Sequence, residues 1–183
     1  MANLRRRVSI GAIINGEWVL IMAEASDPIV YQLGRVLQAK GIWLCTAESC
    51  TGGLIAHRIT NMSGSSGFML GGVVAYANRI KENLLKVRAE TLQSFGAVSP
   101  QTAEEMAIGA LALFDADVAV SVTGIAGPGG GSAEKPVGLV YSAVALKNCM
   151  ARVERNLWSG DRESIKQQTA TRALEMVLET LYD

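Results

Sequence analysis

The stretch that decides the fold is Ile42-Trp43-Leu44-Cys45-Thr46-Ala47-Glu48-Ser49-Cys50-Thr51-Gly52-Gly53. Its first part, residues 42–46, is a short apolar run typical of a buried strand. A turn of small residues follows and contains Ser49, and Gly52-Gly53 then open a helix that extends to Thr60. A strand that passes directly into a helix favours a layered α/β domain.

The alternation of strands and helices continues on both sides of this stretch. Asp27-Pro28 marks a helix start, with Asp as N-cap and Pro in the first turn, and this helix is expected to end at Lys40-Gly41. Ser99-Pro100 marks a second capped helix. The other expected elements are strands or apolar runs over residues 68–76, 118–122, 138–146 and 151–158, and helices over residues 78–86 and 161–181.

The order of these elements predicts the architecture. Two strands follow each other directly near Cys149, which indicates an antiparallel neighbour in the sheet. We expect one α/β domain over residues 27–183, with three α/β/α layers and a mixed, mostly parallel sheet. Residues 1–26 are expected to be an N-terminal extension that contains a strand pair through Asn15-Gly16.

Composition narrows the class of protein. The chain has 183 residues, of which 49% are hydrophobic, enough for one sizeable core. The 17 basic and 17 acidic residues balance, so no overall field would draw the chain to nucleic acid or a membrane surface. The sequence also lacks an apolar stretch of about 18 residues and a secretory signal after Arg5-Arg6-Arg7. We therefore expect no nucleic-acid or membrane partner.

Cysteine and histidine usage adds two expectations. The 3 cysteines are an odd number at irregular spacing, which indicates reduced thiols and a cytoplasmic protein. His57 is the single histidine, and no Cys-x-x-Cys pair is present. Because catalytic zinc sites use several such ligands, no metal is expected.

Three polar side chains fall at the ends of expected strands. Ser49 follows the first strand, Tyr76 closes the second apolar run, and Thr123 follows the strand over residues 118–122. In open α/β sheets, ligands bind beyond the carboxyl ends of the strands. We therefore expect the three strand ends to meet at one site.

Two interpretations of Ser49 remain open. A serine at a strand-to-helix turn exposes its hydroxyl beside free backbone N–H groups, which is the geometry of a nucleophile with a nearby oxyanion site. Alternatively, Ser49 or Thr51 is the N-cap of the helix and satisfies one of those N–H groups. Capping serines far outnumber catalytic ones, so the residues alone favour the cap.

A nucleophilic serine needs a base. His57 is a poor candidate, because it lies two turns into the same helix and should point away from its start. Lys81 lies just past an apolar strand, where burial would lower its pKa and supply a neutral amine; otherwise it is an ordinary solvated lysine. Cys50 is a rival nucleophile, although a small buried cysteine is the commoner fate.

Two further features suit an anionic group. Residues 123–132 form a glycine-rich loop, whose unhindered N–H groups could make an anion nest, or which is simply a long turn. Arg162 lies in the first turn of a helix, where a basic residue is unfavourable for the helix dipole. It would hold a phosphate or carboxylate, or form a surface ion pair.

Five short runs stand in a fixed order along the chain: Thr46-Ala47-Glu48-Ser49-Cys50-Thr51-Gly52-Gly53, Gly71-Gly72-Val73-Val74-Ala75-Tyr76-Ala77-Asn78 with Lys81, Gly96-Ala97-Val98-Ser99, Thr123-Gly124-Ile125-Ala126-Gly127-Pro128-Gly129-Gly130 and Lys135-Pro136-Val137-Gly138. Together they closely resemble the CinA C-terminal family, in its stand-alone short form. The enzymatic members of that family are the nicotinamide-nucleotide amidohydrolases, also called NMN deamidases. The resemblance extends from about residue 28 to the end of the sequence.

The resemblance implies an activity and a set of site residues. The activity is hydrolysis of the carboxamide of nicotinamide mononucleotide (NMN) to nicotinate mononucleotide and ammonia, for pyridine-nucleotide recycling, with no cofactor. It implies catalytic roles for Ser49, Tyr76 and Lys81. The expected substrate-binding residues are Thr51, Gly52, Gly53, Thr123, Gly124, Gly127, Gly129 and Arg162.

A mechanism follows as a hypothesis. Ser49 attacks the amide carbon, and Lys81 takes its proton directly or through Tyr76 and later protonates the departing ammonia. Water then hydrolyses the acyl-enzyme. Backbone N–H groups near Gly52 are expected to stabilise the oxyanion, each contributing about 3 kcal/mol.

The family also supplies a competing hypothesis. Many relatives carry a larger N-terminal domain resembling molybdopterin-binding proteins, which is not expected here. Some short members are inactive paralogues, so the alternative function is a nucleotide-binding or regulatory module linked to competence or DNA damage. A homodimer is expected by analogy with the family, and because symmetric dimers are the commonest oligomers.

Overall fold

A five-stranded sheet forms the centre of the molecule. A computed structural model of the chain describes residues 10–14, 17–21 and 27–182. The sheet has the strand order β4-β3-β5-β6-β7. Its strands are β3 (Leu44–Glu48), β4 (Met69–Val74), β5 (Val118–Gly124), β6 (Leu139–Leu146) and β7 (Arg152–Leu157).

The pairing of these strands confirms the expected mixed, mostly parallel sheet. β3 pairs in parallel with β4 on one side and with β5 on the other. β6 is antiparallel to both of its neighbours, β5 and β7. β6 is therefore antiparallel to the other four strands. The carboxyl ends of β4, β3 and β5 lie together at one edge of the sheet.

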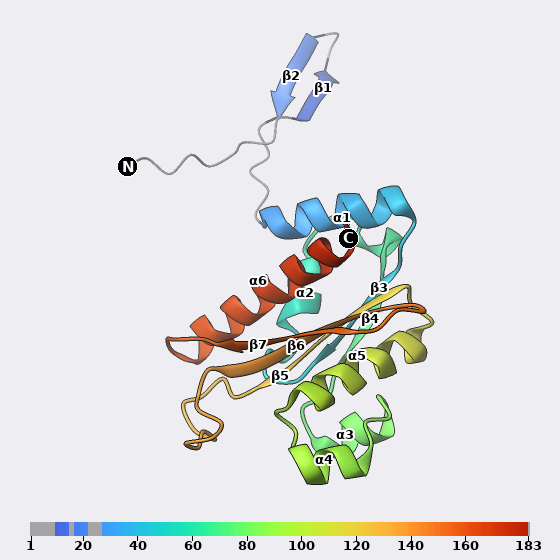
Figure 1. Cartoon of the computed structure of the whole chain (residues 1–183). Coiled ribbons are helices and arrows are strands. Elements are labelled where there is room, and N and C mark those ends of the chain that lie inside the picture. The colour runs from blue at the N-terminus through green and yellow to red at the C-terminus, as the bar shows by residue number, and fades with distance from the viewer. Residues whose placement is uncertain (1–9, 15–16, 22–26, 183) are drawn as a thin grey trace.

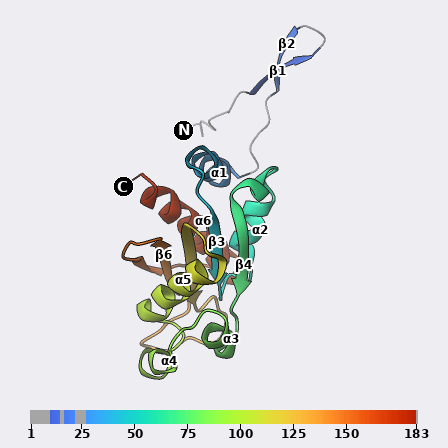
Figure 2. The same cartoon turned by 90° about the vertical axis from the view of Figure 1, so that its right-hand side faces the viewer.

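Helices cover both faces of the sheet, as expected for three α/β/α layers. One face carries α1 (Pro28–Lys40), α2 (Leu54–Thr60) and α6 (Arg162–Thr180) (Figure 1). The other face carries α5 (Pro100–Phe114), with α3 (Asn78–Asn83) and α4 (Ala89–Phe95) beyond it (Figure 2). A single turn of 3-10 helix, Ser65–Gly67, leads from α2 into β4.

The side chains of β3 show why both faces are covered. Leu44 belongs to the core under α1, α2 and α6, whereas Cys45 and Ala47 belong to the core under α5. Residues that alternate along a strand point to opposite faces, and here both faces are apolar. The α5 side uses small residues and close approaches: a Cβ on Gly109 would lie 1.8 Å from the Leu85 carbonyl oxygen.

The helix starts agree with the sequence, but their caps differ. α1 begins at Pro28 after Asp27, yet the Asp27 carboxylate makes no capping bond and pairs with Arg58, Oδ2 to Nε, at 2.6 Å. The start of α5 is confirmed in full, because Ser99 Oγ accepts from the N–H of Thr102 at 3.2 Å.

The largest differences from the expected elements concern β3, α3 and α4. β3 begins at Leu44, later than expected, and continues through Glu48. The expected helix over residues 78–86 ends earlier, at Asn83. The sequence did not predict α4, which is short and has no side-chain cap of its own.

The N-terminal strand pair is present. β1 (Ile10–Ile14) and β2 (Glu17–Ile21) pair antiparallel. The expected turn at Asn15-Gly16 lies outside the described residues. None of the helices in the described part of the chain is long and apolar enough to cross a membrane.

Candidate active site

The expected meeting of three strand ends is confirmed. Ser49 follows β3 directly, Tyr76 lies two residues beyond the end of β4, and Thr123 is the second-to-last residue of β5. The backbone N–H of Ser49 donates to the carbonyl of Val122 at 3.0 Å, which joins the Ser49 turn to β5. The pairing of parallel neighbours therefore places all three residues at one edge of the sheet.

Ser49 and Lys81 are in direct contact. Lys81 Nζ donates to Ser49 Oγ at 3.1 Å and to the carbonyl oxygen of Ala75 at 2.6 Å. Lys81 is only 1% exposed. Burial disfavours the charged amine and lowers the pKa of Lys81 from its ordinary value. The contact therefore pairs a serine hydroxyl with an amine that loses its proton more readily than a solvated lysine.

The cap of α2 is neither Ser49 nor Thr51. The carboxylate of Glu48, a residue 1% exposed, accepts from the Thr51 hydroxyl at 2.7 Å. It also accepts from three backbone N–H groups at the start of α2, those of Gly53 at 3.0 Å, Ile55 at 3.1 Å and Ala56 at 2.9 Å. Because Glu48 satisfies the helix start, the hydroxyl of Ser49 is left to Lys81.

The same bonds bear on the expected oxyanion site. The N–H of Gly52 donates to the carbonyl of Ser49 at 3.1 Å, and the N–H of Gly53 donates to Glu48 at 3.0 Å. These donors are engaged within the chain. The sequence predicted that N–H groups near Gly52 would stabilise an oxyanion. In the structure the N–H groups of Gly52 and Gly53 are not free to do so.

Tyr76 and Arg162 meet across the site. Arg162, the first residue of α6, donates to the Tyr76 hydroxyl at 3.0 Å and to the carbonyl of Gly127 at 2.7 Å. The Tyr76 side chain is 62% exposed, so this contact lies at the surface. Arg162 thus joins α6, the glycine-rich loop and the end of β4. Among the described residues Arg162 forms these two bonds and no ion pair. The predicted contact with a phosphate or carboxylate stays a prediction.

A cavity of about 290 Å³ connects these groups. The predicted residues that line it are Ser49, Tyr76, Lys81, Thr123, Gly124, Gly127, Gly129 and Arg162. Thr51, Gly52 and Gly53 do not line it. Thr51 is buried against Glu48, and the two glycines belong to the turn behind Ser49.

Sequence reasoning missed several residues that shape the cavity. Asn78, Ala97 and Val98 line it, and the Thr123 hydroxyl donates to the carbonyl of Ala97 at 2.6 Å. Glu48 was also missed, because it lies well before the N-cap position of α2, which is Gly53, and reaches the helix start only through the fold of the turn. The role of Ala97 carries no sequence signal, because it acts through its backbone carbonyl.

The surroundings of Cys50 and His57 do not favour a catalytic role as nucleophile or base. Burial raises the pKa of the Cys50 thiol to about 12, so the thiol stays protonated at neutral pH. His57 is exposed on α2 and its ring contacts the side chain of Asn61 at 3.2 Å. Neither residue is the hydrogen-bond partner of the Ser49 hydroxyl, which is Lys81.

A second cavity, of about 430 Å³, lies between α5 and the segment that joins α3 to α4. Its walls are mainly apolar and include Leu84, Ile108 and Leu113, with Arg88 and Glu105 at one side. Among the described residues that line it there is no serine, threonine or cysteine. Of these two cavities, the first is the one that brings the hydroxyl of Ser49 and the amine of Lys81 together.

Comparison with known proteins agrees with this fold and identifies the family. The model of the CinA C-terminal domain matches residues 26–181. Nicotinamide-nucleotide amidohydrolase PncC of Enterobacter agglomerans is 50% identical over 147 residues, which are 80% of this chain and 90% of that protein. The protein of the same name from Escherichia coli K12 is 48% identical, over 79% of this chain and 87% of that one.

Longer relatives and solved structures extend the comparison. A putative competence-damage inducible protein of Moorella thermoacetica is 45% identical over 88% of this chain, which spans only 39% of that protein. The crystal structure of competence/damage inducible protein CihA from Agrobacterium tumefaciens has a TM-score of 0.79 at 46% identity, covering 85% of this chain and 96% of that one. A CinA superfamily protein from Klebsiella pneumoniae has a TM-score of 0.82 at 36% identity, with the same coverage. This chain therefore belongs to the CinA C-terminal domain family.

Proposed function

We propose that this chain is an amidohydrolase that converts NMN to nicotinate mononucleotide and ammonia. The observation that carries the proposal is the buried amine of Lys81, 3.1 Å from the hydroxyl of Ser49. Relatives about half identical to this chain, over nearly all of their own length, are named as nicotinamide-nucleotide amidohydrolases. The contact supplies the chemistry, and the relatives indicate the substrate.

Ser49 is the nucleophile in this proposal. Its Oγ attacks the carboxamide carbon while the neutral amine of Lys81 takes the hydroxyl proton. The C–N bond then breaks, Lys81 returns the proton to the leaving nitrogen, and ammonia departs. Water hydrolyses the acyl-enzyme with Lys81 again as base. The 3.1 Å contact supports direct transfer, because the Tyr76 hydroxyl bonds to Arg162.

The opposite wall of the cavity holds the ribose phosphate. Arg162 uses two donors, on the Gly127 carbonyl and the Tyr76 hydroxyl, and a guanidinium has five. The remaining donors and the N–H groups of the glycine-rich loop, including Gly129, can bind phosphate oxygens. The nucleotide would then lie between Arg162 and Ser49, with its carboxamide at the serine.

Three further proposals concern the metabolic role and compartment of the chain, its oligomeric state and its domain division. The reaction serves pyridine-nucleotide recycling in the cytoplasm, where the free cysteines Cys45, Cys50 and Cys149 would remain reduced. The chain works as a homodimer, the commonest symmetric assembly. The extension over residues 1–26 is separate from the amidohydrolase domain over residues 27–183, and the family match begins at residue 26.

The test is product formation from NMN by the purified chain. Ammonia and nicotinate mononucleotide are expected in equal amounts, and a chelator should leave the rate unchanged because the proposed mechanism uses no metal. Absence of both products at micromolar enzyme would refute the proposal.

The competing function is a nucleotide-binding module without catalysis. It is supported by the name of the Moorella thermoacetica relative, putative competence-damage inducible protein, which states no enzymatic activity. Calorimetry separates the two. A module would release heat on binding NMN without forming ammonia, whereas the enzyme must form ammonia at a rate proportional to its concentration.

A further inference from the structure

Glu48 is a buried carboxylate next to the proposed nucleophile. It is 1% exposed, and burying a charged group without compensation is costly. Its compensation consists of one hydroxyl and three backbone N–H groups, with donor–acceptor distances from 2.7 to 3.1 Å. All four donors belong to the turn after Ser49 and to the first turn of α2. The carboxylate therefore holds the chain segment that follows the nucleophile.

The backbone of Glu48 holds the other side of the contact. The N–H of Ala75 donates to the Glu48 carbonyl at 2.7 Å, and the carbonyl of Ala75 accepts from Lys81 Nζ at 2.6 Å. The distance between Ser49 Oγ and Lys81 Nζ thus depends on two segments that both bond to Glu48. The segment after Ser49 is bound by the side chain of Glu48, and the segment at Ala75 is bound by the main chain of Glu48.

The side chain also removes a competing use of the serine. A helix start with free N–H groups favours a serine or threonine hydroxyl as cap. Ser49 and Thr51 are the hydroxyls of this turn, and Ser49 Oγ bonds to Lys81 instead. Without the Glu48 carboxylate, the N–H groups of Gly53, Ile55 and Ala56 would need another acceptor. Rotation of Ser49 toward them would break its contact with Lys81.

From these contacts we propose that Glu48 is a positioning residue, whose carboxylate occupies the start of α2 so that Ser49 Oγ stays at Lys81 Nζ. The proposal rests on the nucleophilic role of Ser49 proposed above. It leaves Glu48 out of direct contact with the substrate. It also explains how one turn serves both a helix start and a reactive serine.

The test measures the reactivity of Ser49 without NMN. A fluorophosphonate reagent labels nucleophilic serines: the Oγ–P bond forms, fluoride leaves, and the base takes the hydroxyl proton. The second-order labelling rate is measured for the full-length wild type, Glu48→Gln and Glu48→Ala, with Ser49→Ala as the unlabelled blank. Circular dichroism and thermal melting identify the temperature range in which each variant is folded.

The matched control is Glu105→Gln. The Glu105 carboxylate also satisfies a helix start, accepting from the N–H of Arg88 at 2.9 Å and from the hydroxyl of Thr91 at 2.8 Å at the beginning of α4. It does not line the Ser49 cavity. A loss caused only by weakening a helix start would therefore appear in this variant too.

The expected labelling rate is about tenfold lower in Glu48→Gln, which keeps an acceptor oxygen, and lower still in Glu48→Ala. The rate of Glu105→Gln stays within twofold of wild type. The pH at which labelling is half-maximal stays unchanged in Glu48→Gln, because the variant moves Ser49 and leaves Lys81 buried. If Glu48→Ala does not fold, Glu48→Gln decides the matter.

Two changes in labelling rate would overturn the proposal. One is labelling of folded Glu48→Gln within twofold of wild type, and the other is an equal loss in Glu105→Gln. A shift of the pH midpoint would also contradict it, since Glu48 would then act on the proton affinity of the base. Wild type that labels at Ser49 but does not hydrolyse NMN would refute the proposed function alone.

Discussion

Lys81 places a titratable amine where water hardly reaches it. Only 1% of the residue is exposed, and burial lowers its pKa below the ordinary 10.5. In the proposed mechanism the neutral amine is the reactive form, so kcat/KM for NMN should rise about tenfold per pH unit up to the lowered pKa and then level off. A pH–rate profile measures this. A rate that falls as pH rises through the neutral range would contradict a lysine base.

The same shift affects stability, and its sign follows from linkage. The unfolded chain keeps the proton of Lys81 up to about pH 10.5, whereas the folded chain releases it earlier. Folding therefore becomes more favourable as pH rises between the lowered pKa and the ordinary one. Below the lowered pKa the folded state carries the full cost of a buried charged amine.

Cys50 should tolerate substitution, in contrast to its neighbour. Its thiol has a pKa of about 12 because of burial, so almost none is thiolate at neutral pH. We expect Cys50→Ala to keep NMN turnover within about threefold of wild type and to lose about 1 kcal/mol of stability. Steady-state kinetics and denaturant unfolding measure the two effects. A hundredfold loss of turnover in the folded variant would identify Cys50 as the nucleophile.

Most residues of the site could be predicted from the sequence. The bonds that could not be predicted depend on how the chain folds. Ser49, Tyr76 and Thr123 follow from strand ends, and the family resemblance joins Lys81 to them. The bond between Arg162 and Tyr76 links residues 86 positions apart, and no local pattern signals it. The bond from the Gly53 N–H to the Glu48 carboxylate was not predicted, because the N–H groups at the start of α2 were expected to be free.

At the scale of elements, Lys135, which lies just after the glycine-rich loop, connects this part of the chain to the segment between α4 and α5. Its Nζ donates to the carbonyl of Phe95 at 2.7 Å and to that of Val98 at 2.8 Å. Val98 lines the cavity, and the neighbouring Ala97 accepts from Thr123. Two cavity walls are thus held together by one amine.

Lys135→Met should raise KM for NMN about tenfold while changing kcat less. Because one bond is exposed and the other partly buried, we expect their loss to weaken NMN binding by about 1.5 kcal/mol, or about tenfold, and to leave the chemistry at Ser49 in place. Lys147→Met is the control, because Lys147 bonds to exposed Asp115 away from the cavity. An unchanged KM in Lys135→Met, or an equal rise in the control, would contradict this role.

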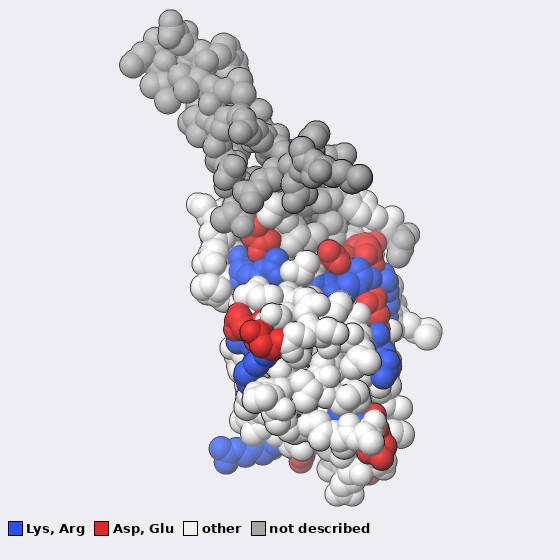
Figure 3. Space-filling model, turned by 90° about the vertical axis from the view of Figure 1, so that its left-hand side faces the viewer, with Lys and Arg blue, Asp and Glu red and all other residues white. Residues whose placement is uncertain are grey.

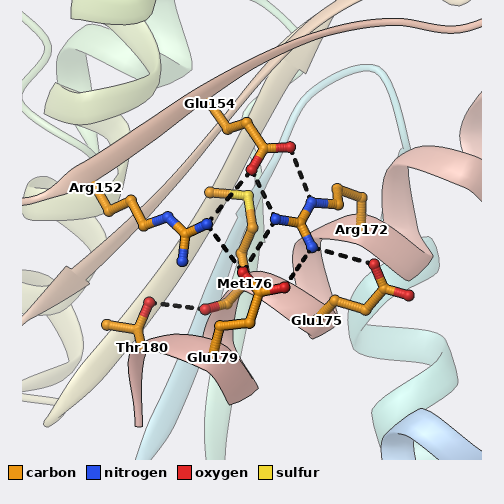
Figure 4. Close-up of polar contacts among 7 residues, drawn as sticks. All are labelled: Arg152, Glu154, Arg172, Glu175, Met176, Glu179 and Thr180. Atoms are coloured by element: carbon orange, nitrogen blue, oxygen red, sulfur yellow. Dashed lines mark hydrogen bonds and ion pairs between the residues drawn. The ribbon is translucent and has the colours of Figure 1, made fainter. Parts of the chain in front are cut away.

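β7 is joined to α6 by a network of charged side chains (Figure 4). Arg172 of α6 bonds to Glu154 of β7 at 2.8 Å and to Glu179 at 2.7 Å, and it also contacts Glu175. Arg152 of β7 pairs with Glu179 at 2.9 Å. The Arg172 side chain is 21% exposed, so the network is partly shielded from water.

Arg172→Met should therefore lower stability by about 1–2 kcal/mol, or Tm by about 2–8 °C, without loss of turnover. Hydrogen bonding to Arg172 lowers the pKa of Glu154, so this contribution is present at neutral pH and is lost as pH falls below the ordinary carboxyl value. Thermal melting at pH 7 and pH 3 measures it. Asp115→Asn, which removes an exposed pair, should change Tm little.

The element sequence was predictable, whereas some boundaries were not. Asp27-Pro28 and Ser99-Pro100 mark the starts of α1 and α5 because local chemistry sets them. α4 gives no such signal, since Glu105 of α5 satisfies the first turn of α4. β3 extends to Glu48 because pairing with β4 and β5 continues past its apolar run.

For the whole molecule, layers and sheet direction follow from the alternation of strands and helices. Basic and acidic side chains lie in mixed clusters over the face shown in Figure 3, in keeping with the zero net charge of the chain. In the proposed function, recognition of an anionic nucleotide therefore depends on local groups, Arg162 and the loop around Gly127, instead of a field of one sign. The strand order itself was not predictable, because pairing partners are chosen by contacts between distant segments.

The central claim is that Ser49, with Lys81 as base, cleaves the carboxamide of NMN. The most direct measurement is ammonia release from NMN by wild type and Ser49→Ala side by side, with melting curves for both. Wild type should release ammonia and nicotinate mononucleotide in equal amounts. Ser49→Ala should be folded and release neither above background, since its loss removes the nucleophile. Turnover by folded Ser49→Ala at a rate near that of wild type would contradict the account.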